Sequence, residues 1–299
     1  MTTSFTSATT LDEALAALAA GARPVAGGTD LVVGARQGKA PLPEAIVAID
    51  RLPELRGLAE SEAGLRIGAL VTHEDVVGSE AVLARYTALA DASWIVGSHA
   101  TRAQGTIGGN VMNASPAMDA GGPLLCFGAT ATLRSFVGER VVALDHLWTG
   151  PGQTTAAPDE LLVSIDVPEP PPGSGSCYVR LEYRRQMEIA IVGATAVVML
   201  AGGTVVDARI GITALSPTIR RIPEAEAILT GSDGGTEAIA AAAQATADAA
   251  TPISDVRGSA AYRSAMATVI TRRAITASIA RAKGQIVPVP ASPALHGVG

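Results

Sequence analysis

The chain has 299 residues, of which 48% are hydrophobic and 3% aromatic, and its formal net charge is −6. This length and hydrophobic content predict a globular protein large enough for two domains, with cores built mainly from Ala, Val, Leu and Ile. The acidic balance gives no general attraction to nucleic acid or anionic lipid, so nucleic-acid binding is disfavoured.

The first residues lack the basic and apolar regions of a signal peptide, and no apolar run approaches the ~20 residues that a membrane-spanning helix needs. We therefore expect a cytoplasmic protein without a membrane span. The two cysteines, Cys126 and Cys177, form no CxxC or Cys/His cluster. This chain alone cannot supply four thiolates to an iron–sulfur cluster or a structural zinc, and we predict no metal site. One disulfide and two buried free thiols are the alternatives, and the thiols are favoured.

The first glycine-rich stretch follows a helix predicted over residues 11–20 and a short strand over residues 24–26. It consists of Ala26, Gly27, Gly28, Thr29 and Asp30, and a short helix is predicted over residues 31–38. Adjacent glycines let a ligand touch the main chain, and free N–H groups at a helix start attract anions. This stretch, the first glycine loop, is predicted to hold a pyrophosphate. Asp30 is expected to cap the helix, because a carboxylate would repel phosphate.

Strands are predicted over residues 45–49 and 65–69, and helices from Thr72 and over residues 79–92. The Thr72 hydroxyl is expected to cap its helix, followed by acidic residues in the first turn. His73 lies in that turn. A single histidine there is expected to be a surface or packing residue rather than a ligand.

The second glycine-rich stretch spans residues 104–110, and its predicted ligand-binding part, the second glycine loop, consists of Thr106, Ile107, Gly108, Gly109 and Asn110. Small polar residues follow it, among them Asn113, Ser115 and Asp119. Such side chains offer the donors and acceptors that a ribityl chain or a ribose needs. The alternative is a turn-rich loop that uses Asn and Ser for local capping. Two glycine-pair loops in one chain favour convergence on one extended ligand.

The middle of the chain predicts a hairpin from strands over residues 129–136 and 140–143, then a strand over residues 161–167. A Pro-rich segment over residues 168–176 marks a domain boundary. Beyond it we predict an antiparallel sheet over residues 177–184, 191–200 and 205–213, then helices over residues 224–229, 235–249 and 259–283. The fold class is α+β. The predicted division is a first domain over residues 1–170, a smaller α+β domain over residues 177–285, and an extended tail over residues 286–299.

No GxGxxG, GxxxxGK[ST], HExxH or GxSxG motif is present. The glycine loops are therefore neither a Rossmann dinucleotide fingerprint nor a Walker loop. They lie about eighty residues apart, so a single βαβ unit, which spans roughly 30 residues, cannot hold both. No residue is singled out as catalytic.

Together, the two glycine loops resemble the FAD-binding loops of the medium subunit of molybdenum hydroxylases, the family of carbon monoxide dehydrogenase and xanthine dehydrogenase. The similarity continues, in the expected order, through residues 113–119, 149–154, 159–162, 183–190 and 255–263. It covers nearly the whole chain.

This resemblance implies a vanillyl-alcohol-oxidase-like (PCMH-type) FAD domain of two subdomains, followed by the smaller C-terminal domain. It implies that residues 26–30 and 106–110 hold the pyrophosphate through backbone N–H groups. Ser115 and Asp119 would lie against the ribityl and phosphate region, and Leu162 and the 184–188 region, with Arg184, near the isoalloxazine ring. Covalent flavin attachment commonly uses a His or Cys near the glycine loop; neither is present there, so the FAD is expected to be non-covalent.

The resemblance also implies an electron-transfer subunit. It would accept electrons from a small [2Fe–2S] subunit and pass them to an external acceptor, beside a large molybdopterin-binding subunit, in a heterotrimer or its dimer. Substrate hydroxylation would take place in the large subunit. The alternatives are a stand-alone flavoprotein oxidoreductase and a non-catalytic FAD- or nucleotide-binding module.

Overall fold

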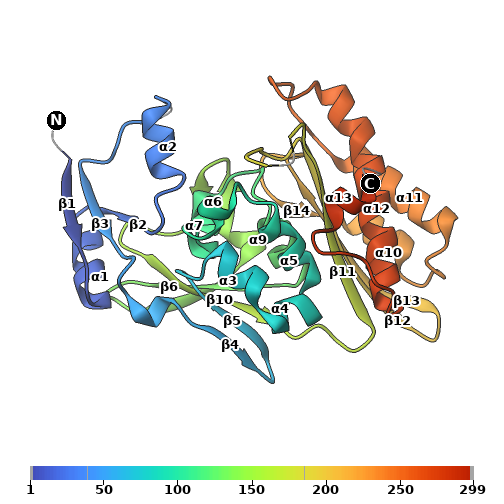
Figure 1. The fold of residues 1–299 in the computed structure, drawn as a ribbon, viewed down its shortest axis with the longest axis horizontal. Coiled ribbons are helices and arrows are strands. Elements are labelled where there is room, and N and C mark those ends of the chain that lie inside the picture. The colour runs from blue at the N-terminus through green and yellow to red at the C-terminus, as the bar shows by residue number, and fades with distance from the viewer. Residues whose placement is uncertain (1–2, 39, 185, 297–299) are drawn as a thin grey trace.

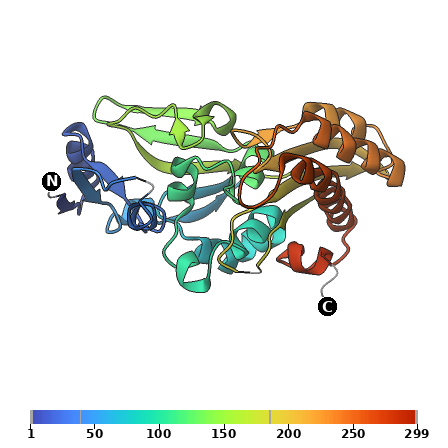
Figure 2. The same cartoon turned by 90° about the horizontal axis from the view of Figure 1, so that it is seen from above.

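The structure is a computed structural model that describes residues 3–38, 40–184 and 186–296. Figures 1 and 2 show an elongated chain, with the N-terminal strands at one end and the C-terminal helices at the other. Its buried hydrophobic residues form three clusters along this length. The mixed helix and sheet content agrees with the predicted α+β class at this level of detail.

The N-terminal part is a three-stranded parallel sheet in the order β1-β3-β2, packed on helix α1. The elements are β1 (Ser4–Ser7), α1 (Leu11–Ala19), β2 (Arg23–Val25), α2 (Leu31–Arg36) and β3 (Ala45–Ala48). Thr10 caps α1 and forms a capping box with Glu13. The first glycine loop therefore lies between a strand and a helix, as predicted. Strand β1 was not predicted, because all four of its residues are exposed and show no apolar alternation.

The middle part is a five-stranded antiparallel sheet in the order β4-β5-β10-β6-β7. Its strands are β4 (Leu58–Ser61), β5 (Gly64–Gly68), β6 (Thr130–Arg134), β7 (Glu139–Ala143) and β10 (Leu161–Pro168). The helices of this part are η1 (Pro53–Leu55), α3 (His73–Gly78), α4 (Glu80–Arg85), α5 (Thr87–Trp94), α6 (His99–Arg102), α7 (Ile107–Asn113), α8 (Gly121–Cys126) and α9 (Leu144–Leu147). A short ribbon pairs β8 (Trp148–Gly150) with β9 (Gln153–Thr154). The β6–β7 hairpin confirms the prediction from the sequence.

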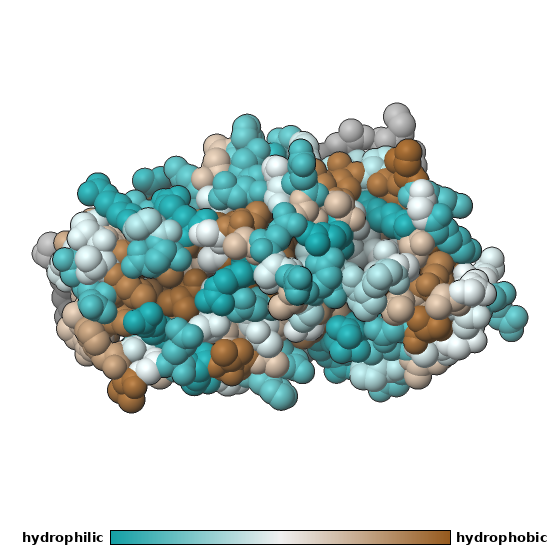
Figure 3. Space-filling model, turned by 90° about the horizontal axis from the view of Figure 1, so that it is seen from below, coloured by the Kyte–Doolittle hydropathy of each residue, from teal (hydrophilic) through white to brown (hydrophobic). Residues whose placement is uncertain are grey.

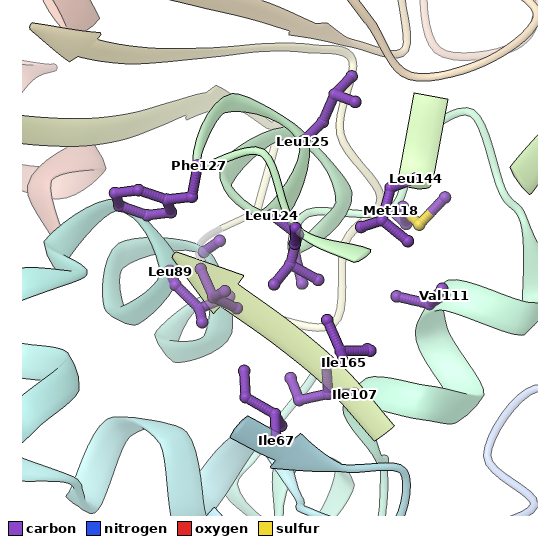
Figure 4. Packing of buried hydrophobic residues seen from close by; sticks show 14 of the residues in the cluster. Ile67, Leu89, Ile107, Val111, Met118, Leu124, Leu125, Phe127, Leu144 and Ile165 are labelled. Atoms are coloured by element: carbon purple, nitrogen blue, oxygen red, sulfur yellow. The ribbon is translucent and has the colours of Figure 1, made fainter. Parts of the chain in front are cut away.

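Helix α7 is held by the middle core, which Figure 4 shows from close by. Ile107 and Val111 of α7 are buried beside Ile67 of β5 and Ile165 of β10. Burial of four such side chains is worth about 1.5–3 kcal/mol each in transfer free energy. This anchoring fixes the second glycine loop, which leads into α7 and forms its first turn.

Two predictions in the middle part differ from the structure. The single helix predicted over residues 79–92 is two helices, α4 and α5, because the backbone of Tyr86 leaves the helical region at φ −118°, ψ 44°. The second glycine loop is not an irregular loop: from Ile107 onward it is helical, with Thr106 as the cap. Favourable capping and burial of Ile107 outweigh the low helix propensity of two glycines.

The C-terminal part is the predicted antiparallel sheet covered by helices. Its strands are β11 (Ser174–Leu181), β12 (Val192–Ala201), β13 (Thr204–Thr213) and β14 (Arg220–Arg221), and its helices are α10 (Pro223–Leu229), α11 (Thr236–Ala249), α12 (Ala260–Ala282) and α13 (Ala291–Leu295). The tail is not simply extended. It forms α13, in which Ala291 and Ser292 are fully buried; residues 297–299 of the predicted tail lie outside the described residues.

A buried ion pair joins the middle and C-terminal parts. The two guanidinium nitrogens of Arg281, on α12, lie 2.6 and 3.1 Å from the two carboxylate oxygens of Asp91, on α5. The same carboxylate accepts hydrogen bonds from the backbone N–H groups of Tyr178 and Ala291. One buried charge thus fixes α5, α12, β11 and the tail together.

The state of the cysteines, the polarity of the surface and the character of the helices can each be compared with the sequence predictions. Cys126 and Cys177 are free and buried, as predicted. Most of the face shown in Figure 3 is hydrophilic or neutral, with hydrophobic residues in separate patches. Within residues 3–38, 40–184 and 186–296, no helix has the length and apolar character to cross a membrane.

His73 is a buried packing residue that supports the second glycine loop. Its backbone N–H donates to the Gly105 carbonyl at 3.1 Å, and its Nδ1 lies 3.3 Å from the Ser93 hydroxyl. Burial, and then the positive charge of Arg102, lower the pKa of His73 from 6.5 to about 4. The folded protein therefore holds this imidazole neutral at neutral pH.

We predict that breaking the buried ion pair costs far more stability than breaking an exposed one. Arg281→Met leaves Asp91 as an uncompensated buried charge and should lower the free energy of unfolding by about 3–5 kcal/mol. The matched control is Arg66→Ala, which removes a surface ion pair with Asp166 and should cost less than about 1 kcal/mol. Urea titration measures both. Equal losses in the two variants would contradict the role given to Arg281.

We also predict that His73 makes stability depend on pH. The unfolded His73 binds a proton near its ordinary pKa of 6.5, whereas the folded one does so only near 4, so stability falls as the pH drops through this window. The full loss is roughly 3 kcal/mol at 1.36 kcal/mol per pKa unit. His73→Gln should reduce the pH dependence of the unfolding free energy between these pH values, and His146→Gln, which changes an exposed side chain, is the control. An unchanged slope in His73→Gln would refute the prediction.

Candidate functional site

The two glycine loops meet in the structure, although about eighty residues separate them. Gly27 packs so closely on the main chain of Gln104 that a Cβ atom on Gly27 would overlap the Gln104 carbonyl. A cavity of about 320 Å³ opens at this junction and is lined by residues of both loops, including Ala26, Gly27 and Thr106. The predicted convergence of the loops is thus present, and it requires glycine at position 27.

The first glycine loop offers unused backbone donors. Among the described residues, the structure shows no acceptor for the N–H groups of Gly27, Gly28 and Thr29. Gly28 has a φ of +68°, in the left-handed region that glycine adopts without strain. Three donors at one turn, at the start of a helix, form a cradle for an anion.

The structure corrects the expected role of the Asp30 side chain as a helix cap. It occupies the N-cap position of α2, as expected, but its side chain makes no capping hydrogen bond. Its backbone is already helical, at φ −95° and ψ −46°, whereas a capping side chain normally comes from a residue with extended backbone. The Asp30 side chain therefore does not cap the start of α2, where the Val32 N–H donates to the Gly28 carbonyl at 3.0 Å.

The second glycine loop differs, because its N–H groups are used within the protein. Those of Ile107 and Gly108 donate to the carbonyls of Val71 and Ala69, at 2.8 and 3.1 Å. Those of Gly109 and Asn110 donate to the Thr106 hydroxyl and carbonyl. This loop is a rigid wall of the site rather than a second set of free donors.

Asn110, at the end of the second glycine loop and outside the cavity lining, carries a polar group without a partner. Its side-chain oxygen is buried and has no hydrogen-bond partner among the described residues. An unpaired buried acceptor costs about 1–3 kcal/mol, so such a group calls for an explanation in a ligand or a water molecule. Together with the free donors of the first loop, it fits a ligand that has a phosphate and a hydroxyl or amide donor. The residues present therefore fit the pyrophosphate and sugar portion of FAD.

The other predicted site residues lie in different settings. Ser115 forms a local turn by accepting a hydrogen bond from the Ala117 N–H. The carboxylate of Asp119 is buried and accepts hydrogen bonds from the Tyr178 hydroxyl, at 2.7 Å, and from Arg180, at 2.8 Å. Both Asp119 oxygens are thus occupied within the protein. Leu162 is buried in the middle core.

Arg184 lies on the segment that connects β11 and β12. It is exposed and pairs with Glu188 at 2.9 Å, while the neighbouring Tyr183 hydroxyl donates to the Arg257 carbonyl. The Met187 N–H donates to the Gly97 carbonyl, just before α6. The segment thus bridges the middle and C-terminal parts near the approach to the second glycine loop; residue 185 of the predicted 184–188 region lies outside the described residues.

Sequence reasoning did not assign to the site six residues that line the cavity: Asp50, Arg56, Leu70, Thr72, Ala103 and Gln104. The Arg56 guanidinium donates to the Asp50 carbonyl, and Arg56 is the one cation among the residues that line this cavity. Gln104 begins the second glycine-rich stretch but was not singled out as a site residue. No local motif marks Asp50 and Arg56, because the fold of β3 and η1 brings them to the site.

No group of three or more metal-ligating side chains is present in the described part of the chain. Both cysteines are buried, and burial raises the pKa of each thiol above its ordinary range, so neither is a thiolate at neutral pH. The chemistry available at the site is therefore binding and orientation of an anionic ligand.

Comparison with known proteins gives two adjoining family matches. Residues 1–170 match the FAD binding domain in molybdopterin dehydrogenase, and residues 178–278 match the CO dehydrogenase flavoprotein C-terminal domain. The carbon monoxide dehydrogenase medium chain of Afipia carboxidovorans is 34% identical over 88% of this chain and 90% of its own. The putative xanthine dehydrogenase FAD-binding subunit of Escherichia coli K12 is 28% identical over 95% of this chain and 98% of its own.

Comparison with solved structures points to the same family. A chain of the reconstituted CO dehydrogenase from Oligotropha carboxidovorans superposes with a TM-score of 0.90 at 31% identity, over 94% of this chain and 99% of that one. A chain of quinoline 2-oxidoreductase from Pseudomonas putida 86 gives 0.87 at 27% identity, over 95% and 98%. These matches confirm the resemblance drawn from the two glycine loops. The chain belongs to the FAD-binding medium-subunit family of the molybdopterin-dependent dehydrogenases.

Proposed function

We propose that this chain is the FAD-binding electron-transfer subunit of a multi-subunit molybdenum hydroxylase. It would receive electrons from a [2Fe–2S] subunit and deliver them to an external acceptor, while a large molybdopterin subunit oxidises the organic substrate. The relatives support this proposal, because they are medium chains of carbon monoxide dehydrogenase and FAD-binding subunits of xanthine dehydrogenase. The redox chemistry is that of FAD, bound without a covalent link.

The observation that carries the proposal is the junction of the glycine loops. At this junction, Ala26 and Gly27 of the first loop and Thr106 of the second loop line one cavity, and the N–H groups of Gly27, Gly28 and Thr29 are unused among the described residues. These N–H groups would bind the pyrophosphate. Arg56 would add a positive charge at the same cavity, which favours a dianionic pyrophosphate over a neutral ligand.

The other predicted site residues would each have a different role in binding FAD. Thr106 and Asn110 would face the ligand from the second loop, with the Asn110 oxygen accepting a hydrogen bond from it. The main chain at Ser115 and Leu162, and the segment that carries Arg184, would approach the ribityl chain and the ring. Asp119 would act through Arg180, by joining the loop after α7 to β11.

We further propose the division into domains that the sequence predicts. The FAD domain over residues 1–170 would be of the PCMH type, with one subdomain on the parallel sheet and one on the antiparallel sheet. Separate hydrophobic clusters under these two sheets, and a third under β11–β14, support this division. The cytoplasmic location stays a prediction of the sequence.

We predict that Gly27→Ala abolishes or strongly weakens FAD binding. A methyl group there must push the first loop away from Gln104, which displaces the donors by about an ångström or more and should raise the Kd at least tenfold. FAD titration of the purified chain, followed by its absorption near ~450 nm, measures the effect.

Gly34→Ala is the matched control, because it adds the same methyl group on α2, where the methyl would contact no atom beyond its chain neighbours and the backbone of its own helix. Gly28→Val should also prevent FAD binding, since a branched residue is strained at a φ of +68°. In both loop variants the C-terminal part should stay folded. Full FAD content in Gly27→Ala and Gly28→Val would overturn the assignment of the site.

We predict that the FAD-loaded chain undergoes reduction and reoxidation but does not oxidise an organic substrate by itself. Dithionite should bleach the flavin band, and an artificial electron acceptor should restore it. Purification from the native host should bring down one larger and one smaller subunit. FAD bound without reduction would favour a non-catalytic binding module, and full catalytic turnover by the isolated chain would favour a stand-alone oxidoreductase.

A further inference from the structure

A second cavity, of about 420 Å³, lies where β11 ends against α12 and α13. Figure 1 shows these elements together in the C-terminal part. None of the residues lining this cavity, here named the α12 cavity, also lines the cavity at the glycine loops. Its volume is within the range of small-molecule pockets, about 300–1,000 Å³.

The walls of the α12 cavity are mainly apolar. They are formed by Leu181, Met266, Val269, Ile270 and Pro293. Apolar walls with a few converging polar groups are typical of pockets that bind small organic molecules. An inorganic ion alone would leave this apolar surface in contact with water.

Arg273 and His296 are two of the polar residues that line the cavity, and they form a hydrogen bond with each other. Arg273 Nη1 lies 2.5 Å from His296 Nδ1, and His296 Nε2 lies 2.6 Å from the Arg180 carbonyl oxygen. A carbonyl can only accept, so Nε2 donates and Nδ1 must accept from Arg273. His296 is therefore neutral, and burial, opposed only in part by this carbonyl, lowers its pKa in the same direction.

Two arginines, Arg184 and Arg273, line the cavity. Of these, Arg273 has no carboxylate partner among the described residues. Glu182 lies 3.1 Å from Arg180, which also pairs with Asp119 at 2.8 Å, and Arg184 lies 2.9 Å from Glu188. Among the described residues, no carboxylate lies within 4.0 Å of the Arg273 guanidinium. Its Nη2 and Nε groups remain for a planar, bidentate acceptor.

We propose that the α12 cavity binds a small organic carboxylate, with its apolar body against Met266, Val269 and Ile270 and its carboxylate on Arg273. One guanidinium without a carboxylate partner can bind one carboxylate, and the Glu182 carboxylate in the cavity lining would repel a more highly charged ligand such as a polyphosphate. A metal cation would be repelled by Arg273 and finds no cluster of His, Cys, Asp and Glu in the described part of the chain. The α12 cavity shares no lining residue with the cavity at the glycine loops; of its lining, Arg184 lies on the segment proposed to approach the flavin ring.

The test is calorimetric titration of the full chain with benzoate as the probe. Benzoate should bind saturably at one site. Benzamide, which keeps the ring without the charge, and acetate, which keeps the charge without the ring, should each bind at least ~10-fold more weakly. FAD content should not change when benzoate is added, which separates this site from the proposed function.

Variants at neighbouring positions of α12 test the assignment of the charge. Arg273→Gln should weaken benzoate binding at least ~10-fold, whereas Arg272→Gln, at an exposed position outside the cavity lining, should leave it unchanged. Met266→Trp should fill the cavity and weaken binding without removing any charge. Retained FAD binding shows that each variant is folded. The proposal is overturned if benzoate does not saturate, if benzamide binds equally well, or if Arg273→Gln binds like the unmodified chain.

Discussion

The close approach of the Gly27 backbone to the Gln104 carbonyl is the constraint on which the site depends. It joins a loop of the N-terminal parallel sheet to a loop that the middle core holds, and no side chain fits between them. Any residue larger than glycine would separate the two loops and open the cavity between them. The identity of one residue thus sets the geometry of a site formed by segments about eighty positions apart.

Buried charge pairs extend this constraint to the C-terminal part. Asp119 follows the second glycine loop and pairs with Arg180 of β11, while Asp91 pairs with Arg281 of α12. A buried pair adds little net stability over apolar packing, since desolvation cancels much of the attraction, but it strongly disfavours any arrangement that separates the partners. These pairs therefore specify how the two parts dock more than they add to total stability.

The sequence predicts elements well where local pattern decides the structure. Helices α11 and α12, the β6–β7 hairpin and the sheet of β11–β13 all have clear periodicity or turn signals. Prediction from the sequence fails where contacts between residues far apart in the chain determine the structure. Glycine content argued against a helix at Gly108 and Gly109, yet burial of Ile107 in a distant core and the Thr106 cap make one. The type of residue at Asp119 suggested a ligand contact, but its partners, Tyr178 and Arg180, cannot be found by local reasoning.

The two glycine loops have different physical roles despite their similar sequences. The second loop satisfies its own N–H groups and is anchored by buried residues of α7, so it can form without a ligand. The first loop leaves its donors free, and the α2 helix that follows it has no buried residue. Its conformation must depend on contact with the second loop and on the anion it binds. Part of the binding energy would then be used to order the first loop against a wall that is already formed.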